Sequence, residues 1–394
     1  MSTRDLDQMW ARHSAEWREP AQVASQWEEA ASVDPGLLKY RVRGDWWGIL
    51  ESTGSTLLVT REYEHLALAL CVVDGAPVVS YMKLPHPSGL AVDRDRGVVY
   101  IASTRNPNQV YDFEPVSGLK PRLDMDGAPA VSGRPLVPAR SRYYPGCTYM
   151  HDLAVIGGEV YANSVGQNAV VRLGDGGDAE RVWWPRCIET AGGPVFGQNH
   201  IQLNSIAAGD DLEGSYFSAS AAAISARRPG HRNFPVDGRG VIFSGLSREP
   251  VAGGLTRPHS ARLFEGRVWV DNSGYGQVGF AEDGKFIPVA GLPGWTRGLG
   301  FHDKMAFVGT SRVLPRFTQY APGLDVERSV CGLHAVDTRS GQILGSLTWP
   351  QGNQVFAVEL APTSLTTGFP FRADRRRSAE TEKKLFYAFE THRA

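Results

Sequence analysis

The chain has 394 residues, of which 42% are hydrophobic and 21% are charged, and this ordinary globular composition excludes a wholly disordered chain. Its 41 basic and 42 acidic residues leave a net charge of −1, which gives no reason to expect nucleic acid or an acidic membrane surface as a partner. The 44 glycines and 25 prolines predict many turns and disfavour a helix bundle.

Targeting and redox features are few. No apolar run approaches the roughly 18–20 residues that a membrane helix needs, and the first residues lack the pattern of a signal peptide. The four cysteines lie far apart without a CxxC pair, which disfavours a structural zinc site and a disulfide scaffold. We therefore expect a soluble, cytoplasmic protein with reduced thiols.

Residues 1–40 differ from the rest of the chain. They are rich in Glu, Arg, Ala and Gln, and the interruption at Pro20 predicts two short helices, the second from about Ala21 to Ala31. We interpret them as a helical arm that covers one end of a β domain. An oligomer contact, which would make the protein a homo-oligomer, or a lid is the alternative.

From about Arg43 the sequence indicates short strands bounded by Gly, Asp, Asn and Pro. One phrase recurs, in which polar residues open an apolar strand that is followed by a turn and a second apolar strand. Its clear copies begin at Ser88, His151, Asn204, His259 and Arg297, and weaker copies begin at Trp47 and Phe356.

The repeat length and strand content predict one all-β domain, a β-propeller over residues 41–365, because each blade takes roughly 40–50 residues. We favour seven blades, with six as the alternative. The first and last copies are incomplete, so strands from both ends of the chain are expected to close one blade. Residues 366–394 form a charged tail with helix-favouring composition, expected to dock on the outside.

The residue that opens each inner strand should lie near the mouth of the central channel. Five of the seven residues at this position are polar, and two of them are His151 and His259. Because imidazole is the commonest metal ligand and a natural acid–base group at neutral pH, these two histidines are the candidate catalytic residues, together with Arg297. Arg297 is also expected to hold an anionic group of the substrate.

Further polar residues near these strands complete the expected site. We expect Asn204, Asp152 and Arg312 to contribute to substrate binding. A transition metal, iron first with copper or zinc as alternatives, would be held by histidines of separate blades, at positions 86, 151, 200 and 259. Plain acid–base chemistry by the same histidines remains open at this stage.

Several motifs have a familiar order and spacing. They are HDLA at 151–154, LNSIA at 203–207, RPHSAR at 257–262 and LPGWTRGL at 292–299. In these motifs the chain resembles an uncharacterised bacterial propeller family of unknown function, over roughly residues 43–362. His86 and His200 depart from the pattern of that family, which suggests ligands added to a shared pocket. More distantly, the repeat is similar to gluconolactonase-like propellers, which hold calcium; Asn204 fits that resemblance, whereas the histidines and Arg297 do not, because calcium prefers oxygen ligands.

The leading functional hypothesis is an enzyme acting on a small anionic or amino-acid-derived metabolite in a His-lined central pocket, with an oxidoreductase that uses a transition metal as the favoured type. One alternative is a propeller without catalytic activity that binds a ligand or a protein partner. The other is a calcium-dependent hydrolase of the lactonase kind.

Overall fold

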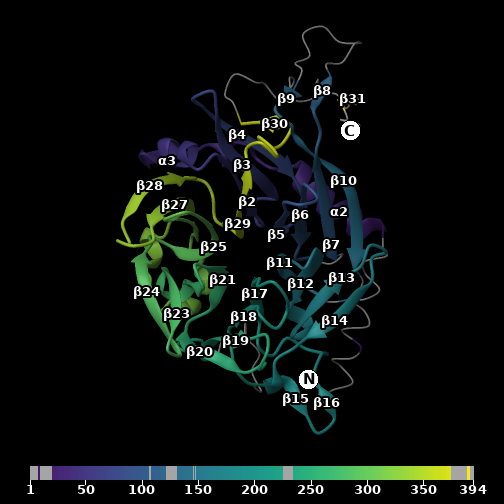
Figure 1. The fold of residues 1–394 in the computed structure, drawn as a ribbon, viewed down its shortest axis with the longest axis vertical. Helices are drawn as coiled ribbons and strands as arrows, with labels where there is room; N and C mark the ends of the chain where they lie inside the picture. The colour runs from purple at the N-terminus through teal and green to yellow at the C-terminus, as the bar shows by residue number, and fades with distance from the viewer. Residues whose placement is uncertain are drawn as a thin grey trace.

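Antiparallel four-stranded sheets surround a central axis in the computed structural model of the protein (Figure 1). The structure describes residues 8, 20–105, 108–120, 131–144, 146, 148–224, 234–373 and 388–390. The first of the two predicted arm helices lies outside the described residues. The fold is an all-β propeller, as the repeat predicted.

Six strands lie innermost, one in each four-stranded unit of the described chain. They are β5 (Pro87–Asp93), β11 (Met150–Ile156), β17 (Leu203–Ala207), β21 (Pro258–Phe264), β25 (Trp295–His302) and β29 (Ala357–Pro362). Each inner strand contacts the inner strands of both neighbouring units, so the six close into a ring.

The other three strands of each unit follow outward from the axis. Beside β29 and β5, these strands are β2 (Ser55–Arg61), β3 (Leu66–Val73) and β4 (Ala76–Lys83), and β6 (Val98–Ser103), β7 (Asn108–Pro115) and β10 (Leu136–Tyr144), respectively. Beside β11 and β17, they are β12 (Glu159–Ser164), β13 (Ala169–Leu173) and β14 (Ala179–Trp183), and β18 (Tyr216–Ala219), β19 (Gly240–Ser244) and β20 (Pro250–Leu255), respectively. Beside β21 and β25, they are β22 (Arg267–Asn272), β23 (Gln277–Glu282) and β24 (Lys285–Gly291), and β26 (Met305–Ser311), β27 (Gly332–Asp337) and β28 (Ile343–Thr348), respectively. A single parallel bridge, Gly253 to Lys285, joins the outer strands β20 and β24.

The favoured number of seven blades is not what the structure shows. The first weak copy of the repeat, which begins at Trp47, is no inner strand but part of helix α3 (Trp46–Ser52). The strand that follows it, β2, pairs instead with β29 from the other end of the chain, from Ser55 opposite Pro362 to Thr60 opposite Ala357. The two incomplete copies therefore make one unit, closed by both ends of the chain as expected.

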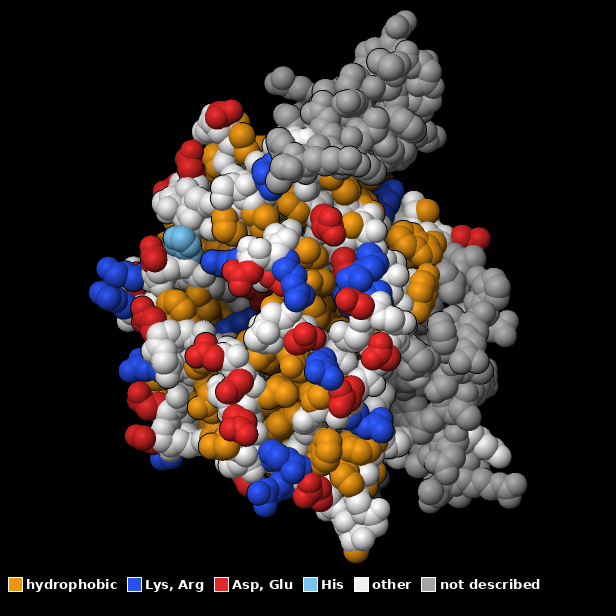
Figure 2. Space-filling view, turned by 45° about the vertical axis from the view of Figure 1, so that its right-hand side comes forward, with side chains coloured by type: hydrophobic (Ala, Val, Ile, Leu, Met, Phe, Trp, Pro, Cys, Tyr) orange, Lys and Arg blue, Asp and Glu red, His pale blue; other side chains and the backbone are white. Residues whose placement is uncertain are grey.

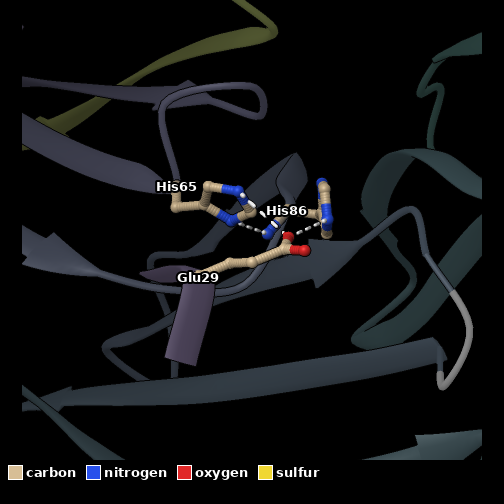
Figure 3. Close-up of side chains that lie close together, drawn as sticks. All are labelled: Glu29, His65 and His86. Atoms are coloured by element: carbon tan, nitrogen blue, oxygen red, sulfur yellow. Dashed lines mark hydrogen bonds and ion pairs between the residues drawn. The ribbon is translucent and has the colours of Figure 1, made fainter. Parts of the chain in front are cut away.

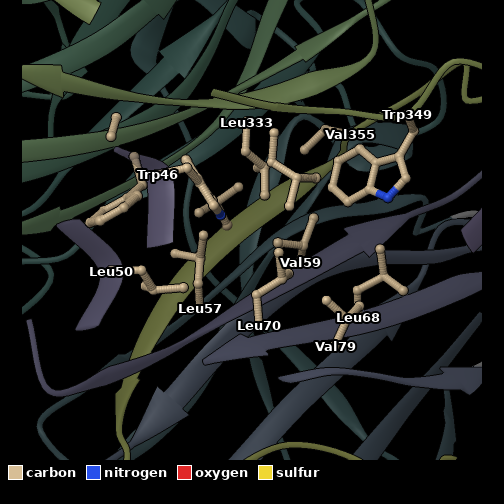
Figure 4. Close-up of a cluster of buried hydrophobic side chains, with 14 of the residues drawn as sticks. Trp46, Leu50, Leu57, Val59, Leu68, Leu70, Val79, Leu333, Trp349 and Val355 are labelled. Atoms are coloured by element: carbon tan, nitrogen blue, oxygen red, sulfur yellow. The ribbon is translucent and has the colours of Figure 1, made fainter. Parts of the chain in front are cut away.

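The hydrophobic core is divided among the gaps between neighbouring units, and the described residues contain one large cluster in each of the six gaps. Figure 4 shows the cluster between the β2–β4 and β25–β28 units, in which Leu57 and Val59 of β2 lie near Leu333 of β27. Trp46 and Leu50 of α3 cover the same cluster. Strands buried on both faces explain the nearly continuous apolar run of β2 and β3.

Peripheral segments surround the ring. Helix α2 (Pro20–Ala31) matches the second predicted arm helix, and a 3-10 turn, η1 (Pro35–Leu38), links it to the edge strand β1 (Arg41–Gly44), which extends the β25–β28 unit. The described parts of the tail, residues 366–373 and 388–390, contain two short strands in place of the expected helix. Strand β30 (Phe371–Arg372) pairs with β4, and strand β31 (Ala388–Glu390) pairs with β8 (Gly118–Lys120). The remaining short strands are β9 (Val131–Ser132), β15 (Glu189–Thr190) and β16 (Gly193–Pro194).

Charged side chains of both signs are interspersed over the face seen in Figure 2. This distribution agrees with the net charge of −1 and shows no large field of one sign there. Among the described residues, no helix combines the length and the apolar character needed to cross a bilayer.

Candidate functional site

A cavity of about 510 Å³ lies at the end of the ring where the inner strands begin. Four of the seven residues predicted for the channel mouth line it. They are His151 of β11, His259 of β21, Arg297 of β25 and Phe356, which lies directly before β29. The antiparallel pairing brings the ends of the second strands to the same edge, so residues that follow β2, β6 and β26 complete the wall.

The beginnings of the inner strands have irregular backbones. The pairing register shifts within the first residues of β5, β11, β17, β21 and β25, as at a β-bulge, which turns side chains toward the axis. Two residues before the predicted ring position, Tyr149, Gln202 and Arg257 adopt positive φ angles of 47°, 48° and 54°. All three line the cavity, so this turn geometry supplies a second circle of side chains.

Two arginines that line the cavity, Arg257 and Arg297, are buried. Arg297 is 9% exposed, and its guanidinium lies 3.3 Å from the ring centroid of Phe356. Arg257 is 7% exposed, stacks 4.5 Å from the ring centroid of Tyr320 and donates a hydrogen bond to Gln202. Neither guanidinium forms an ion pair with a carboxylate of the described residues. Burial lowers the pKa of each to about 10, so both remain charged at neutral pH.

The environment of His259 fixes its tautomer. Its Nδ1 lies 2.8 Å from the carbonyl oxygen of Arg257 and 2.9 Å from Ser273 Oγ, whose own proton is donated to the carbonyl of Thr296 at 2.6 Å. Both neighbours of Nδ1 are therefore acceptors, so Nδ1 carries the proton and Nε2 is the unprotonated atom. Burial, followed by the charge of Arg297, lowers the pKa of His259 well below its usual value.

His151 is the second neutral imidazole of the cavity. Burial and then the charge of Arg297 lower its pKa to about 3, and its ring meets Phe356 edge-on, with 5.5 Å between the centroids. Its Nδ1 is buried and has no hydrogen-bond partner among the described residues. At neutral pH the two histidines consequently add no positive charge, and the unprotonated nitrogen of each can accept a hydrogen bond.

Glu62 provides the only carboxylate among the described residues that line the cavity. Burial opposes its ionisation, but the contact with His86 and the charge of Arg105 lower its pKa to about 2. Its Oε1 lies 3.2 Å from Arg105 Nε and accepts a hydrogen bond from Thr104 Oγ1 at 3.0 Å. Arg312, predicted to bind substrate, also lines the cavity and donates to the carbonyl of Pro350. Four arginines thus face one carboxylate, a balance of +3 (4 − 1) among the charged lining residues.

Two predicted substrate-binding residues lie outside the cavity lining. Asn204 is 2% exposed, and its amide nitrogen donates to the carbonyl of Pro258 at 2.8 Å and to Ser220. Asn204 therefore links neighbouring inner strands. Its side chain also partly offsets the lowering of the His151 pKa by burial. Asp152 accepts the backbone N–H of Ile206 and pairs with Arg262 at 2.8 Å. Its carboxylate therefore already has partners within the ring.

The four histidines proposed as metal ligands do not gather in one place. His151 and His259 line the cavity, whereas neither His86 nor His200 does. His200 lies before β17, and its backbone N–H donates a hydrogen bond to Asn168 Oδ1 at 2.8 Å. His86 contacts Glu62 on one side and a separate group, Glu29 and His65, on the other. Glu29, His65 and His86 together are the one set of three potential metal ligands within reach of one another in the part of the chain that the structure describes.

Sequence reasoning missed Arg257 and Glu62, and a signal for the first was present. In the copies that begin at His151, Asn204, His259, Arg297 and Phe356, the residue two positions earlier lines the cavity; these are Tyr149, Gln202, Arg257, Trp295 and Gln354. At the ends of the second strands, the first residue after β2 is Glu62 and the first residue after β6 is Thr104, and both line the cavity. Reading only the ring position left out this second circle.

Comparisons with solved structures find propellers and other proteins of low identity. The chain is similar to a chain of a nidogen/laminin complex (TM-score 0.49, 11% identity, covering 78% of this chain and 99% of that one). It is also similar to a protein of unknown function from Bacteroides caccae (TM-score 0.46, 9% identity, 78% and 98% covered) and to XC5397, a gluconolactonase from Xanthomonas campestris (TM-score 0.42, 12% identity, 76% and 86% covered).

No curated protein matches the chain. A family model matches residues 44–367, which agrees with the extent of the resemblance found in the motifs. The chain belongs to the family described as "Domain of unknown function (DUF4915)".

Proposed function

We propose that the protein is an enzyme that binds a small organic anion through Arg297 and Arg257 and begins its reaction by proton transfer to His259. One observation carries the proposal: two buried guanidinium groups without a carboxylate partner among the described residues line the same cavity as an imidazole with a fixed, unprotonated Nε2. The substrate class is a small molecule with a carboxylate or phosphate group.

The charge of the cavity supports an anionic ligand. A buried charge is costly unless it is paired, and among the described residues the guanidinium groups of Arg257 and Arg297 contact aromatic faces and, for Arg257, the neutral Gln202. The charge of Glu62 also favours the charged form of Arg297, but the two groups do not form an ion pair. Guanidinium groups bind carboxylates and phosphates through two parallel hydrogen bonds, and stacking on Phe356 and Tyr320 fixes their planes. The ligand would therefore supply the missing counter-charge.

The position of His259 supports the proton transfer. Its Nε2 is a neutral acceptor at pH 7, and its Nδ1 proton is held by the carbonyl of Arg257, which keeps the ring in one orientation. The charges of Arg297 and Arg257 lower the basicity of His259 in the free protein, and a bound anion would offset them. A proton taken from a substrate C–H next to the anionic group, or from a water molecule, would then go to Nε2. The electron pair that it leaves develops negative charge, which Arg297 would stabilise.

The positive charge of the cavity lining also argues against a metal ion in the cavity. A dication at His151 and His259 would lie among Arg105, Arg257, Arg297 and Arg312, with Glu62 as the lone carboxylate of the described lining. Calcium would need several oxygen ligands, and Glu62 is already engaged by Arg105 and Thr104. We therefore propose acid–base chemistry in place of the oxidoreductase and lactonase alternatives.

A binding titration tests the anion site. Inorganic phosphate and a panel of small mono- and dicarboxylates are titrated into the protein, with calorimetry and the fluorescence of the cavity residue Trp295 as readouts. Arg297→Met and Arg257→Met should each weaken binding by roughly 10–100-fold, as expected for a lost charge-assisted hydrogen bond. Arg328→Met, at a side chain that is 86% exposed, is the matched control and should bind normally. Equal affinity in all four proteins would overturn the proposed site.

Turnover of the bound anions tests the catalytic part. His259→Gln should keep the affinity of the anion but lose turnover, because the amide occupies similar space without a basic nitrogen. Full activity of this variant would refute the role of His259. Tight binding with no turnover by the native protein, across the panel, would instead favour the alternative of a ligand-binding propeller.

A further inference from the structure

A second group of potential ligands lies outside the cavity, where helix α2 meets the ring (Figure 3). Glu29 belongs to α2, His65 lies in the turn between β2 and β3, and His86 lies directly before β5. Glu29 Oε2 is 3.7 Å from His65 Nε2 and 3.7 Å from His86 Nε2. Three segments far apart in the sequence therefore direct one carboxylate oxygen and two imidazoles at one point.

These separations suit a tetrahedral metal ion. Zinc bonds to His nitrogen and carboxylate oxygen are roughly 2.0–2.2 Å long, so two ligands of a tetrahedron are about 3.4 Å apart. The observed 3.7 Å is within a small side-chain adjustment of that value. The site is accessible, because Glu29 is 62% exposed and the two histidines are 13% and 15% exposed.

The surroundings of His86 also fit a metal ligand. Its Nδ1 lies 3.4 Å from Glu62 Oε1, on the opposite side of the ring from the atom that faces Glu29. Metal-binding histidines commonly donate their second N–H to a carboxylate, which orients the ring and increases its basicity. Glu62 is held for this role by Arg105 and Thr104.

His65 shows what metal binding must change. Its Nδ1 accepts the backbone N–H of His86 at 3.2 Å, so the neutral ring carries its proton on Nε2, facing Glu29. Coordination through Nε2 moves that proton to Nδ1, and the amide of His86 loses its acceptor. The amide of His86 is therefore a specific reporter of metal binding.

We propose that Glu29, His65 and His86 bind a Zn²⁺ ion, with a water molecule as the fourth ligand, and that this ion fixes helix α2 to the propeller. Three protein ligands with an open position form a recurring zinc arrangement. The site does not depend on the proposed function, although Glu62 connects it to the wall of the cavity.

The test uses the full chain without an affinity tag, stripped with a chelator and titrated with ZnCl₂ by calorimetry. Co²⁺ serves as a coloured substitute, because a tetrahedral site gives intense visible absorption. We expect one ion per chain, and a shift of the His86 amide resonance on binding. Glu29→Gln, at an exposed residue that should not disturb folding, and His86→Asn should each abolish the site, whereas Glu62→Gln should weaken it by roughly 10–100-fold.

His302→Asn is the matched control, because His302 lies 3.6 Å from the exposed carboxylate of Asp303 on another part of the surface. It should bind zinc like the native protein. Absence of stoichiometric zinc binding, or equal zinc binding by native protein and Glu29→Gln, would overturn the proposal. Anion affinity of Glu29→Gln should be unchanged, so failure of this site and failure of the anion site are separate results.

Discussion

The strongest stability prediction concerns Arg262, whose side chain reaches across the ring. From β21 it pairs with Asp152 of β11 at 2.8 Å and with Glu359 of β29 at 2.9 Å. These three strands alternate around the axis, so one guanidinium joins three units that do not touch as immediate neighbours in the ring. Arg262→Met removes the charge but keeps an apolar stem of similar length.

The size of the effect follows from burial. Breaking a buried ion pair costs about 3–5 kcal/mol, and the lower end applies here because Glu359 is 24% exposed. We expect Arg262→Met to lower the free energy of unfolding by about 3 kcal/mol at pH 7. Arg267→Met is the matched control: Arg267, on the adjacent strand, forms an exposed pair with Glu282, whose loss should cost about 1 kcal/mol or less.

The loss should also depend on pH. Burial raises the pKa of Glu359 while Arg262 opposes that rise, so removing Arg262 raises this pKa further. A carboxyl group with a folded pKa above its unfolded value contributes stability at low pH and loses it as the pH rises. The difference between native protein and Arg262→Met should therefore shrink as the pH is lowered toward about 5.

Urea unfolding at several pH values measures these differences, and a second substitution isolates their cause. Adding Glu359→Gln to Arg262→Met should recover about 1–2 kcal/mol, because only one carboxylate then remains without its partner. A loss below about 1 kcal/mol for Arg262→Met, or no recovery in the double variant, would refute the reasoning.

Two further predictions concern the pH range of the site and the packing of the inner strands. Affinity for a carboxylate, which does not itself titrate in this range, should stay constant between about pH 6.5 and 8.5, with no step near the usual histidine pKa. The reason is that His259 stays neutral and Arg297 stays charged, and calorimetry in buffers across this range measures it. Gly89→Ala should destabilise the protein by about 1–3 kcal/mol in urea unfolding, because a Cβ there would lie 2.7 Å from the backbone of Asp152 on the next inner strand. Gly253→Ala is the control, because a Cβ there would have its nearest neighbour, Val241 Cγ1, at 3.8 Å. Equal losses of stability in the two variants would contradict the packing argument.

Much of the fold follows from the sequence because the repeat is strong. Alternating apolar strands and frequent turns indicated a propeller, and the incomplete end copies indicated closure by both ends of the chain, as the pairing of β2 with β29 confirms. The predicted number of blades was too high because the copy of the repeat at Trp47 is not an inner strand. The run around Trp47 has the polarity of an inner strand, but in the structure Trp46 and Leu50 bury one face of helix α3 against the outer strands.

The candidate site was predictable where it depends on repeat position and not where it depends on local backbone. His151, His259 and Arg297 occupy equivalent positions, and the structure places all three at one cavity. Asp152 follows His151, and simple strand alternation does not say where its side chain goes, because a register shift interrupts the pairing between Met150 and Leu153.

The features that the sequence did not predict depend on contacts between segments that are distant in the chain. His86 shares a repeat offset with the cavity residue Arg257, yet it faces Glu29 of the arm. Nothing in a single sequence specifies where helix α2 docks, so the partner of His86 could not be predicted. The same holds for the ion pairs of Arg262, whose partners come from two other units.

Closure of one unit by both ends of the chain has a consequence for synthesis of the protein. Strand β2 is made early, but its inner partner β29 is completed only at Pro362. A nascent chain that has not reached this residue has an open ring with an unpaired edge on β2. A chain that ends before residue 356 also lacks Phe356, against which Arg297 stacks. The cavity can therefore assemble only near the end of translation, so chains that stop earlier would lack it and would be exposed to edge-to-edge association.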